Sequence, residues 1–512
     1  MTDDMGLGKS LSMISLIASD RDPATLERMP LQTSVSQTTD SIRCTLLVVP
    51  SSLVQTWETQ LGRHLRSDSL KWFKHHGKQK VRHRDDVEDV DIVITTYETL
   101  SSEWGKRTTW ISPVFSIYWH RLVLDEAHYI KDRTRQTAQA IFTLHADRRW
   151  AMTGTPVQNR LSDLASLFQF LRVHPYDNPE RFNEDITRLW VNHAEAEAIN
   201  RAKRLFHFTG IRRSNDTIEL PKRTDKLYRL EFSSAERQLY ESLRVDTIET
   251  LEGCTSSKTP PRTRFLNVLH RFNTLRMICN LGTNQSFTSK DLGEWNSKSA
   301  SEAFAALAVY GQPLICKKYA EVEHTSPDPT QSNLQCRQST VSTKIRSLVT
   351  DIEQNLTEKS VVFSFWTSTL DLVETALVAS HIRVARVDGR VSEKKRKHEL
   401  DSFRSNSSIS VILLTISCGA VGLDLTAASR AYIMEPHWNP TVEEQALARI
   451  HRLGQKREVT TIRFVMNGTC EDHVRKVQDR KTLMADVLLS TKKASGTNKG
   501  PGRLDILRSL LN

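Results

Sequence analysis

Residues 1–10 read MTDDMGLGKS and contain the elements of a phosphate-binding loop. Gly6 and Gly8 let backbone N–H groups close around phosphate oxygens, and Lys9 can reach the β- and γ-phosphates of a nucleotide. Ser10 supplies a hydroxyl for Mg²⁺ at the start of a predicted helix, whose positive end faces the anion. The common pattern has Gly where this sequence has Asp3, so the stretch alone is also compatible with an ordinary glycine-rich helix cap.

Short apolar runs alternate with helix-like segments along the chain. A continuous apolar run such as 45–50 (TLLVVP) is typical of a strand buried on both faces of a parallel sheet. The segment 51–65 then has apolar residues at spacings of four, which indicates a helix. On this basis we predict strands at 45–50, 90–97, 121–124 and 150–153, and again at 360–365, 382–387, 411–415, 431–434 and 461–465.

Strands that alternate with helices predict a parallel α/β architecture, which here comes in two separate parts. Between the two parts the alternation stops. That segment has helical stretches at 234–251 and 264–278 joined by Pro/Ser/Thr-rich turns, which we interpret as a helical insertion with flexible connections. The expected organisation is a first lobe at 1–220, a helical insertion at 221–340, a second lobe at 341–490 and a tail at 491–512.

Composition and charge limit the class of protein. Of the 512 residues 38% are apolar, and no apolar run approaches the roughly 18 residues of a membrane-spanning helix, so we expect a soluble protein without a membrane partner. The N-terminus lacks the basic and then apolar segments of a signal peptide. The net charge of +11 comes from 71 basic and 60 acidic residues. Such an excess is compatible with a nucleic-acid partner and equally with a solvated basic surface.

The seven cysteines are scattered through the chain, and no C-x-x-C pair is present. Paired cysteines or histidines at short spacing are the usual signature of a structural zinc site, and regular cysteine spacing is that of a disulfide framework. Neither pattern occurs. We therefore expect no zinc and no disulfides, and a reducing compartment.

A second motif, Leu124-Asp-Glu-Ala-His128, follows one of the predicted buried strands. A carboxylate at the C-terminal tip of a central strand lies beside a phosphate loop, where Asp125 can hold Mg²⁺ together with Ser10. The adjacent Glu126 can position and deprotonate an attacking water. An isolated Asp-Glu pair is more often two capping acids at a helix start, but the phosphate loop upstream favours the metal and water roles.

A third motif, residues 445–455 (QALARIHRLGQ), lies near the end of the second predicted lobe. On a helix Gln445, Arg449 and Arg452 fall at i, i+4 and i+7, which is one face. Two arginines on such a face can neutralise the charge that develops on a γ-phosphate, the role of an arginine finger. A solvated basic helix face explains the same spacing when the motif is taken alone.

Taken together, MGLGKS and DEAH resemble helicase superfamily two, and longer segments resemble the SWI/SNF-type (Snf-family) DNA-dependent ATPases. Within that family the sequence of these segments is most similar to that of the helicase-like-transcription-factor branch. The motifs occur in family order from residue 3 to about 490. The segments that carry the resemblance are 47–57 (LVVPSSLVQTW), 91–100 (DIVITTYETL), 119–131 (WHRLVLDEAHYIK), 150–164 (WAMTGTPVQNRLSDL) and 445–455.

The resemblance implies two RecA-like lobes of the P-loop NTPase class, with ATP and Mg²⁺ bound in the cleft between them. It implies translocation on double-stranded DNA, largely independent of sequence, or chromatin remodelling rather than strand separation. A nuclear location, nucleosome or chromatin partners, and a role in repair or transcription follow from the same likeness. It assigns Gly6, Gly8, Lys9, Ser10 and Gln445 to nucleotide binding, Ser10 and Asp125 to Mg²⁺, and Glu126, Arg449 and Arg452 to catalysis, with Arg452 favoured as the finger.

Two further segments of the second predicted lobe, 415–428 and 394–397, have sequences that suggest contact with DNA or a role in targeting. Residues 415–428 (TISCGAVGLDLTAA) resemble the motif that links ATP to DNA tracking, and Gly419 and Gly422 would permit close approach to a phosphodiester backbone. Relatives usually carry Asn at the position of Asp424, which leaves its contact with DNA open. The run 394–397 (KKRK) is interpreted as a solvated helix face in preference to a nuclear localisation signal.

Two departures from the family pattern matter for function. The zinc-binding RING insertion of the most similar branch has no counterpart here, so we expect no ubiquitin-ligase activity. The sequence also has almost nothing before its phosphate loop, and we expect the first lobe to lack its first strand, the adenine-recognising segment and any N-terminal DNA-binding module. The alternative function is therefore a truncated, catalytically weak homologue that binds DNA or protein.

Overall fold

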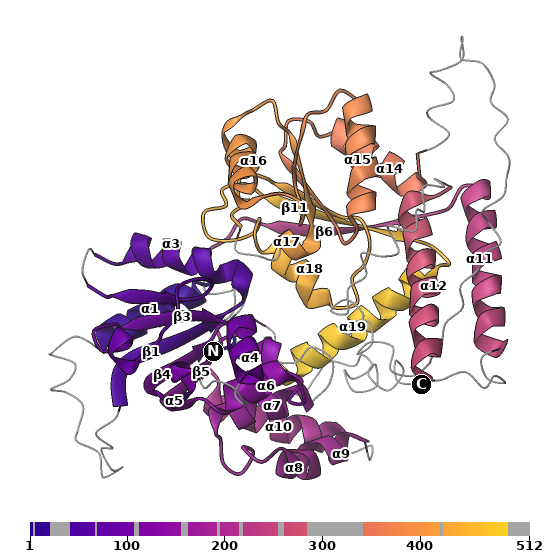
Figure 1. Ribbon diagram of the computed structural model, residues 1–512. Coiled ribbons are helices and arrows are strands. Elements are labelled where there is room, and N and C mark those ends of the chain that lie inside the picture. The colour runs from indigo at the N-terminus through magenta and orange to yellow at the C-terminus, as the bar shows by residue number, and fades with distance from the viewer. Residues whose placement is uncertain are drawn as a thin grey trace. The chain divides into compact units, whose positions relative to one another are not determined.

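The computed structural model forms two compact units, which we call the first lobe and the second lobe (Figure 1). The first lobe comprises Met1–Glu219 together with the chain from Lys481 on, and the second comprises Leu220–Arg480. The structure describes residues 1–3, 6–20, 41–66, 69–106, 112–154, 162–191, 195–213, 219–253, 261–283, 341–419 and 423–489.

The first lobe is built on a parallel five-stranded sheet in the order β2-β3-β1-β4-β5. Because all five strands run in the same direction, their carboxyl ends meet at one edge, where α/β proteins place their ligand sites. The strands are β1 (Ser41–Val49), β2 (Trp72–His75), β3 (Ile92–Thr96), β4 (Tyr118–Leu124) and β5 (His145–Ala151).

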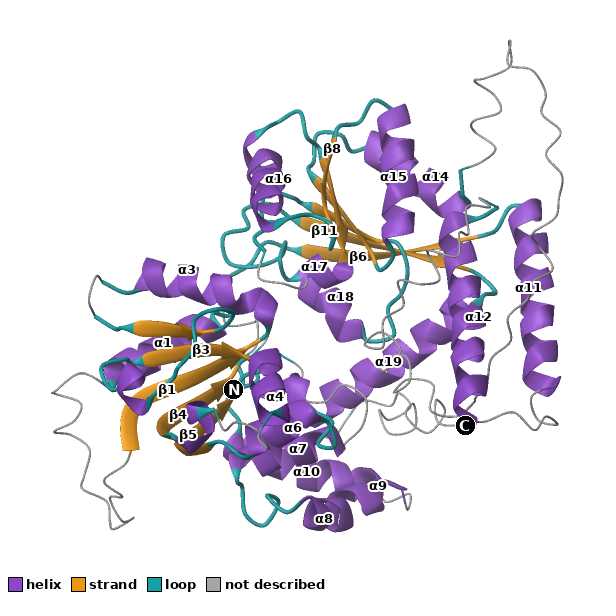
Figure 2. Ribbon diagram, in the orientation of Figure 1, coloured by secondary structure: helices purple, strands orange, loops and turns teal. Residues whose placement is uncertain are grey.

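Helices cover both faces of this sheet, as the run of apolar residues in its central strands predicts (Figure 2). Alternate residues of a strand point to opposite faces. Leu46 and Val48 of β1 pack in a core with α4, α6 and α7, whereas Leu47 and Val49 pack with α1 and α3. The helices of this lobe are α1 (Lys9–Ser19), α3 (Val54–His64), α4 (Tyr97–Gly105), α5 (Pro113–Ser116), α6 (Gln136–Phe142), α7 (Ser162–Leu171), α8 (Pro179–Phe182), α9 (Arg188–Val191) and α10 (Glu195–Thr209), with short η1 (Ser51–Leu53), η2 (Arg84–Val87), η3 (Ala127–Ile130) and η4 (Asn183–Thr187).

The second lobe is built on a parallel six-stranded sheet in the order β6-β11-β10-β7-β9-β8. Its outermost strand β6 belongs to the segment that follows the first lobe, and it pairs with β11 from Arg223 opposite Val459 to Leu230 opposite Met466. The strands are β6 (Arg223–Leu230), β7 (Ser360–Ser364), β8 (Val384–Val387), β9 (Val411–Thr415), β10 (Arg430–Ile433) and β11 (Val459–Met466).

This sheet is also covered on both faces. Val362 of β7 packs in a core with α14 and α15, and its neighbours Val361 and Phe363 pack on the opposite face with α16 and α18. The helices are α11 (Ser234–Gly253), α12 (Pro261–Leu281), α14 (Thr343–Glu353), α15 (Thr367–Ala379), α16 (Glu393–Ser405), α17 (Ile416–Gly419), α18 (Pro440–Leu447) and α19 (Cys470–Leu489), which belongs to the second lobe as far as Arg480. The basic run 394–397 lies on α16, where Lys394, Lys395 and Lys397 are exposed.

The sequence predicts the inner strands of both sheets and the edge strands β5 and β8, and β1, β4 and β5 begin earlier than predicted. It does not predict β2 or β6. Both lie at the edge of a sheet, each with one neighbouring strand, and both carry charged and partly exposed residues. A strand at the edge of a sheet can lack a continuous apolar run, because its two faces are not both fully buried. Two predicted helices, at 234–251 and 264–278, are confirmed as α11 and α12.

Candidate active site

The loop before α1 has the backbone that its glycines allow. Gly6 and Gly8 have φ angles of 90° and 74°, a region that strains any residue with a side chain. Gly8 precedes the first residue of α1, Lys9, and its carbonyl accepts a hydrogen bond from Ser12 N at 2.9 Å. The Lys9 ammonium donates to the backbone carbonyl of Asp3 at 2.9 Å, which holds it over the loop. Met5, within the same motif, lies outside the described residues.

Residues 1–3 are bonded to the carboxyl end of β5. Met1 donates from its amino group to Ala151 O at 2.8 Å, and its own carbonyl accepts from Thr153 N at 3.1 Å. On the other side, Thr2 N donates to Ile211 O at 2.8 Å. The three residues therefore lie between the end of β5 and the chain around Ile211, and they lead directly into the glycine loop.

Asp3, which stands where the common loop pattern has Gly, is fully buried. Its carboxylate accepts 2.8 Å hydrogen bonds from the backbone N and the Nε of Arg213. Arg213 also donates from Nη2 to Ser12 Oγ in α1 at 2.9 Å. Asp3 therefore joins the loop to Arg213. The sequence pattern alone does not suggest this structural role.

Asp125 lies at the carboxyl end of β4, as predicted, and is almost fully buried. Its Oδ2 accepts from the indole N–H of Trp57 at 2.8 Å, and its Oδ1 accepts from the backbone N of Glu126 at 3.0 Å. The Tyr97 hydroxyl donates to its carbonyl at 2.8 Å. Residues from α3 and from the start of α4 thus fix the orientation of this carboxylate.

The electrostatics around Asp125 oppose its ionisation. Burial raises its pKa to about 6, and the neighbouring Glu126 carboxylate contributes to the increase. The hydrogen bond from Trp57 and the positive charge of Lys9 act in the opposite direction. Lys9 is therefore close enough to Asp125 to act on it, so the structure brings together the phosphate-loop lysine and the strand-end acid. Burial and the adjacent carboxylate nevertheless outweigh these two effects, and the net pKa of Asp125 stays above its usual value.

Glu126 has an unusual backbone for a residue with a side chain, with φ 49° and ψ 53°. Hydrogen bonds on either side hold it there: Asp125 N donates to Val48 O at 2.9 Å, and Ala127 N donates to Met152 O at 2.8 Å. Its Oε2 lies 3.2 Å from Nδ1 of His128. The two adjacent acids thus have different partners, one beside Trp57 and the other beside an imidazole.

The arginine motif of the second lobe has a different local structure from the predicted one. The helix that carries it, α18, ends at Leu447, and residues 448–454 form turns and a bend. Arg449 N and Ile450 N each donate to a carbonyl three residues earlier, at 3.2 and 3.0 Å, as in a tightened turn. The prediction that Gln445, Arg449 and Arg452 share one helix face is therefore wrong. Gln445 is buried in α18, and Arg449 and Arg452 lie in the turns beyond it.

Gln455 ties these turns to the segment 423–428. Its side-chain amide donates to the carbonyls of Thr426, Ala428 and Ile450 at 3.2, 2.8 and 3.1 Å. Leu425 N donates to the carbonyl of Arg449 at 3.0 Å. The predicted DNA-tracking segment and the arginine motif therefore form one bonded unit.

Gly419 and Asp424 have roles within the lobe. A Cβ atom on Gly419 would lie 2.5 Å from Cε1 of Phe363, so contact with its own sheet favours a glycine there. Gly422 lies outside the described residues. Asp424 caps a turn by accepting from the N and Oγ1 of Thr426 at 3.1 and 2.8 Å. Burial raises the pKa of Asp424, but Thr426, Arg404 and Arg452 lower it more, and the net pKa is below its usual value. Asp424 and Arg452 thus act on each other.

Sequence reasoning missed the residues that support the site. Trp57 and Tyr97 have apolar rings that read as core, and nothing in the sequence shows that their N–H and O–H reach Asp125. The Asp3–Arg213 pair joins positions that are far apart in the chain. Of the motif at 153–156, Thr153 is buried and donates to Met1 O, while Thr155 and Pro156 lie outside the described residues.

No group of three or more His, Cys, Asp or Glu side chains among the described residues is arranged to hold a metal ion. In the same part of the chain, no helix is long and apolar enough to cross a membrane. The described cysteines, Cys44, Cys279, Cys418 and Cys470, are free thiols.

The two parallel α/β lobes, with the glycine-lysine-serine loop and the strand-end acid pair in the first, define the class of protein. It is a helicase-type P-loop protein with two RecA-like lobes. The family model described as the SNF2-related domain matches residues 1–282, and the helicase conserved C-terminal domain matches residues 343–454. The chain belongs to the SNF2-related family.

Individual relatives agree with this assignment. The chain is 30% identical to the human (Homo sapiens) helicase-like transcription factor, over 92% of this chain and 53% of the relative. It is 28% identical to the DNA repair protein RAD5A of Arabidopsis thaliana, over 86% of this chain and 50% of the relative. The chain thus spans about half the length of these relatives. Among solved structures, the Sulfolobus solfataricus SWI2/SNF2 ATPase core in complex with dsDNA is 20% identical, covers 96% of this chain and 90% of that chain, and has a TM-score of 0.38.

Proposed function

We propose that this SNF2-family protein is an ATP-dependent motor that moves on double-stranded DNA. The observation that carries the proposal is the first-lobe site, where Lys9 at the start of a helix acts electrostatically on the buried Asp125 at the end of a central strand. A lysine at a helix N-terminus beside a strand-end carboxylate suits the phosphates of a nucleoside triphosphate and a divalent cation. Membership of the SNF2-related family supports the same reaction.

Each lobe contributes different residues to the proposed hydrolysis of ATP. In the first lobe, the loop N–H groups at Gly6 and Gly8 and the Lys9 ammonium would bind the phosphates. Glu126 would orient the attacking water and accept its proton. In the second lobe, Gln445, Arg449 and Arg452 would complete the nucleotide site, the two arginines by stabilising negative charge on the γ-phosphate.

The acid pair fits a divalent cation. Burial and the adjacent carboxylate raise the pKa of Asp125 to about 6, so a nearby positive charge would favour its ionised form. Carboxylate and hydroxyl oxygens are the protein ligands that Mg²⁺ prefers, and it usually keeps several waters. Asp125 and Ser10 are the residues that would hold it, and when bound it supplies charge neutralisation for the phosphates.

Double-stranded DNA is the proposed substrate of the motor, without strong sequence preference. The net charge of +11 is compatible with phosphate contacts, and the relatives carry names that include DNA repair protein and transcription factor. A nuclear location, chromatin or nucleosome partners, and a role in repair or transcription are part of the same proposal.

ATP hydrolysis by the full chain, with and without linear duplex DNA, tests the proposal. We expect duplex DNA to raise the rate several-fold and Lys9→Ala to reduce it by about a hundredfold, because loss of a phosphate-binding charge removes transition-state stabilisation. Lys78→Ala is the matched control, since Lys78 is an exposed lysine of the same lobe. A wild-type rate equal to that of Lys9→Ala in the presence of duplex would overturn the motor and leave a binding module without turnover.

Binding to duplex DNA at several salt concentrations tests the substrate. Phosphate contacts release counterions, so affinity for two unrelated sequences should fall together by at least about tenfold between roughly 50 and 200 mM salt. A flat salt response, or a strong preference for one sequence, would contradict contacts made mainly to phosphates.

A further inference from the structure

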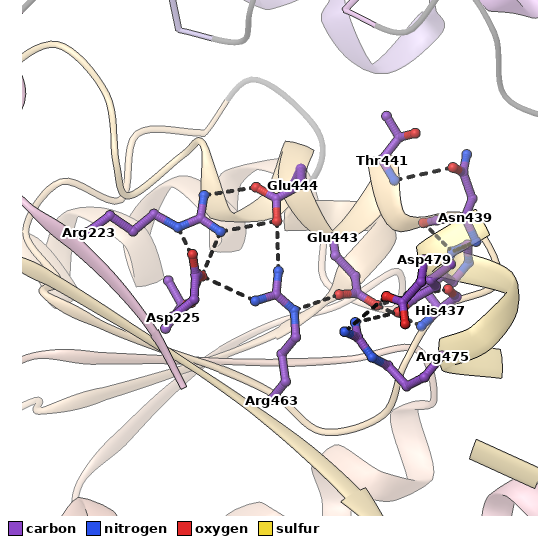
Figure 3. Close-up of polar contacts among 12 residues, drawn as sticks. Arg223, Asp225, His437, Asn439, Thr441, Glu443, Glu444, Arg463, Arg475 and Asp479 are labelled. Carbon is purple, nitrogen blue, oxygen red and sulfur yellow. Dashed lines mark hydrogen bonds and ion pairs between the residues drawn. The ribbon is translucent and has the colours of Figure 1, made fainter. Parts of the chain in front are cut away.

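The turns that bear Arg449 and Arg452 are bonded to the segment with which the second lobe begins. That lobe starts at Leu220, and its first strand, β6, starts at Arg223. Figure 3 shows side chains of β6, β11 and α18 meeting in one cluster of ion pairs. The cluster therefore connects the chain that leaves the first lobe with the helix that leads into the arginine turns.

Glu444 of α18 is the centre of this cluster. It forms a two-point pair with Arg223 of β6, with Nη1–Oε2 and Nη2–Oε1 distances of 2.8 and 3.1 Å. Arg463 of β11 donates from Nη2 to the same Oε1 at 2.7 Å. Two-point pairs between arginine and carboxylate fix orientation as well as distance. Glu444 thus holds α18 in a set position against both strands.

Asp225 completes the connection between the two strands. Its Oδ1 lies 2.8 Å from Nη2 of Arg223 and 3.2 Å from Nη1 of Arg463 (Figure 3). Burial opposes the charge on Glu444, but Arg223 and Arg463 lower the pKa of its carboxyl, so it is ionised at neutral pH. The four side chains therefore alternate in charge, each beside two partners of opposite sign.

The neighbouring Glu443 fixes the first turns of α18. It is almost fully buried. Its Oε1 accepts a hydrogen bond from His437 N at 2.8 Å, and its Oε2 accepts one from Nε of Arg463 at 3.0 Å. The helix begins after Asn439, whose Oδ1 accepts from Thr441 N at 3.2 Å. The start of α18 is therefore fixed by side-chain hydrogen bonds and an ion pair.

His451, between the two arginines, makes the second link. Its Nε2 lies 2.8 Å from the carbonyl oxygen of Pro221, and a carbonyl can only accept, so the imidazole donates. Arg449 and Arg452 lie beyond the end of α18, where Arg449 N donates to Ala446 O at 3.2 Å and Leu425 N donates to Arg449 O at 3.0 Å. Their placement is therefore set by bonds to the end of α18 together with contacts from outside the helix.

We propose that Glu444 and His451 are positioning residues for Arg449 and Arg452, and that through them the segment 221–225 sets where the two arginines stand. The proposal rests on the proposed function, because it assigns support to arginines whose role is itself proposed. The segment 221–225 follows the first lobe in the chain, so a displacement of that segment would be passed to the arginine turns through two bonded contacts.

Glu444→Gln tests the ionic link. It removes the negative charge and one acceptor, and we expect kcat for DNA-stimulated ATP hydrolysis to fall about ten- to a hundredfold, as small misplacements of catalytic groups do. KM for ATP and affinity for duplex DNA should stay within about twofold of wild type. Glu458→Gln is the matched control, because Glu458 is an exposed acid of the same lobe and loses the same charge.

His451 tests the second link without touching the ion pairs. His451→Ala removes the donor to Pro221 O and should lower kcat about tenfold, whereas His451→Gln retains an N–H in a similar place and should restore most of the rate. A role limited to stability would not separate these two variants by kcat at saturating ATP while leaving KM unchanged.

Amide hydrogen exchange of residues 446–452 supplies a readout that needs no turnover. In Glu444→Gln and His451→Ala these amides should exchange at least about fivefold faster than in wild type, with β11 unchanged. Unchanged exchange and unchanged kcat in either variant would overturn the proposal, as would equal losses in Glu458→Gln. A wild type no faster than Lys9→Ala would overturn the proposed function alone, and exchange would still decide whether Glu444 and His451 hold the turn.

Discussion

At the scale of single residues, the acid pair of the first lobe shows how backbone strain and burial are combined. Glu126 adopts a left-handed backbone, which costs a residue with a side chain about 1–3 kcal/mol. The hydrogen bonds of its neighbours to Val48 and Met152 hold it there. The two adjacent carboxylates have different partners, Trp57 for Asp125 and His128 for Glu126, which is compatible with their proposed roles as metal ligand and general base.

Trp57→Phe should move the acid limb of the pH–rate profile. The indole N–H of Trp57 lowers the pKa of Asp125, which burial holds at about 6. Without this donor the pKa of Asp125 rises further, so protons inactivate the site at higher pH. Since a hydrogen bond to a charged group contributes about 1.5–3 kcal/mol, we expect the acid limb of kcat/KM to move about one pH unit or more toward alkaline values.

The profile is measured by DNA-stimulated ATP hydrolysis between about pH 5 and 9. Trp72→Phe makes the same exchange at an exposed tryptophan of β2 and should leave the limb in place. An unshifted limb in Trp57→Phe would show that Asp125 does not control the acid side of the profile.

At the scale of elements, the end of α17 is set by contact with the second sheet. Gly419→Ala would place a Cβ 2.5 Å from Cε1 of Phe363 in β7, so either the ring or the helix must move. Overpacking of this kind costs about 1–3 kcal/mol. In a lobe of this size the thermal midpoint should fall by about 2–10 °C.

Thermal unfolding of the variant beside Gly389→Ala checks this expectation, because a Cβ on Gly389 meets nothing within 4 Å. Equal stability of the two variants, together with weaker DNA binding by Gly419→Ala alone, would instead favour the interpretation that Gly419 is needed for close approach to DNA.

What the sequence reveals about these elements depends on where each one is buried. Inner strands such as 411–415 are apolar at every position but Thr415, so the sequence alone indicates that they are buried. The strand β6 reads RTDKLYRL, and only its pairing with β11 makes it a strand. The spacing of Arg449 and Arg452 predicts one helix face, because the residues from 445 to 452 are all compatible with a helix. The structure instead ends α18 at Leu447, and the turn that follows is bonded to Leu425, a contact that the spacing does not reveal.

At the scale of the whole molecule, each lobe has its own candidate residues and its own buried charges. The first-lobe residues Lys9, Asp125 and Glu126 could be found from local motifs, because each follows or precedes a recognisable element. Their supports Trp57 and Arg213 could not, since long-range contacts leave no local pattern. The pKa is lowered for the buried carboxyl of Glu103 in the first lobe and raised for that of Glu435 in the second, so we expect the two lobes to respond to pH in opposite directions.

The first lobe should lose stability in acid through Glu103. Burial opposes the charge of Glu103, but hydrogen bonds from His75, Lys80 and Ser112 outweigh it and lower its pKa from 4.5 to about 2. A depressed folded-state pKa contributes stability that is complete above about 4.5 and is lost as the pH falls toward 2, about 3 kcal/mol in all. Glu103→Gln should remove this acid dependence and lower stability at neutral pH.

The second lobe should become more stable as the pH falls from about 7, because of Glu435. Burial raises the pKa of this carboxyl from 4.5 to about 7 despite the N–H of Phe365 and the charge of Lys344. A folded-state pKa above the unfolded one disfavours folding at high pH, and the penalty, about 3 kcal/mol, is relieved as the pH falls from about 7 to 4.5. Hydrogen exchange at several pH values, corrected for intrinsic rates, resolves the two lobes. Between pH 7 and about 5 the core amides of the second lobe should become better protected in wild type and not in Glu435→Gln, and equal behaviour of the two proteins would contradict the assignment.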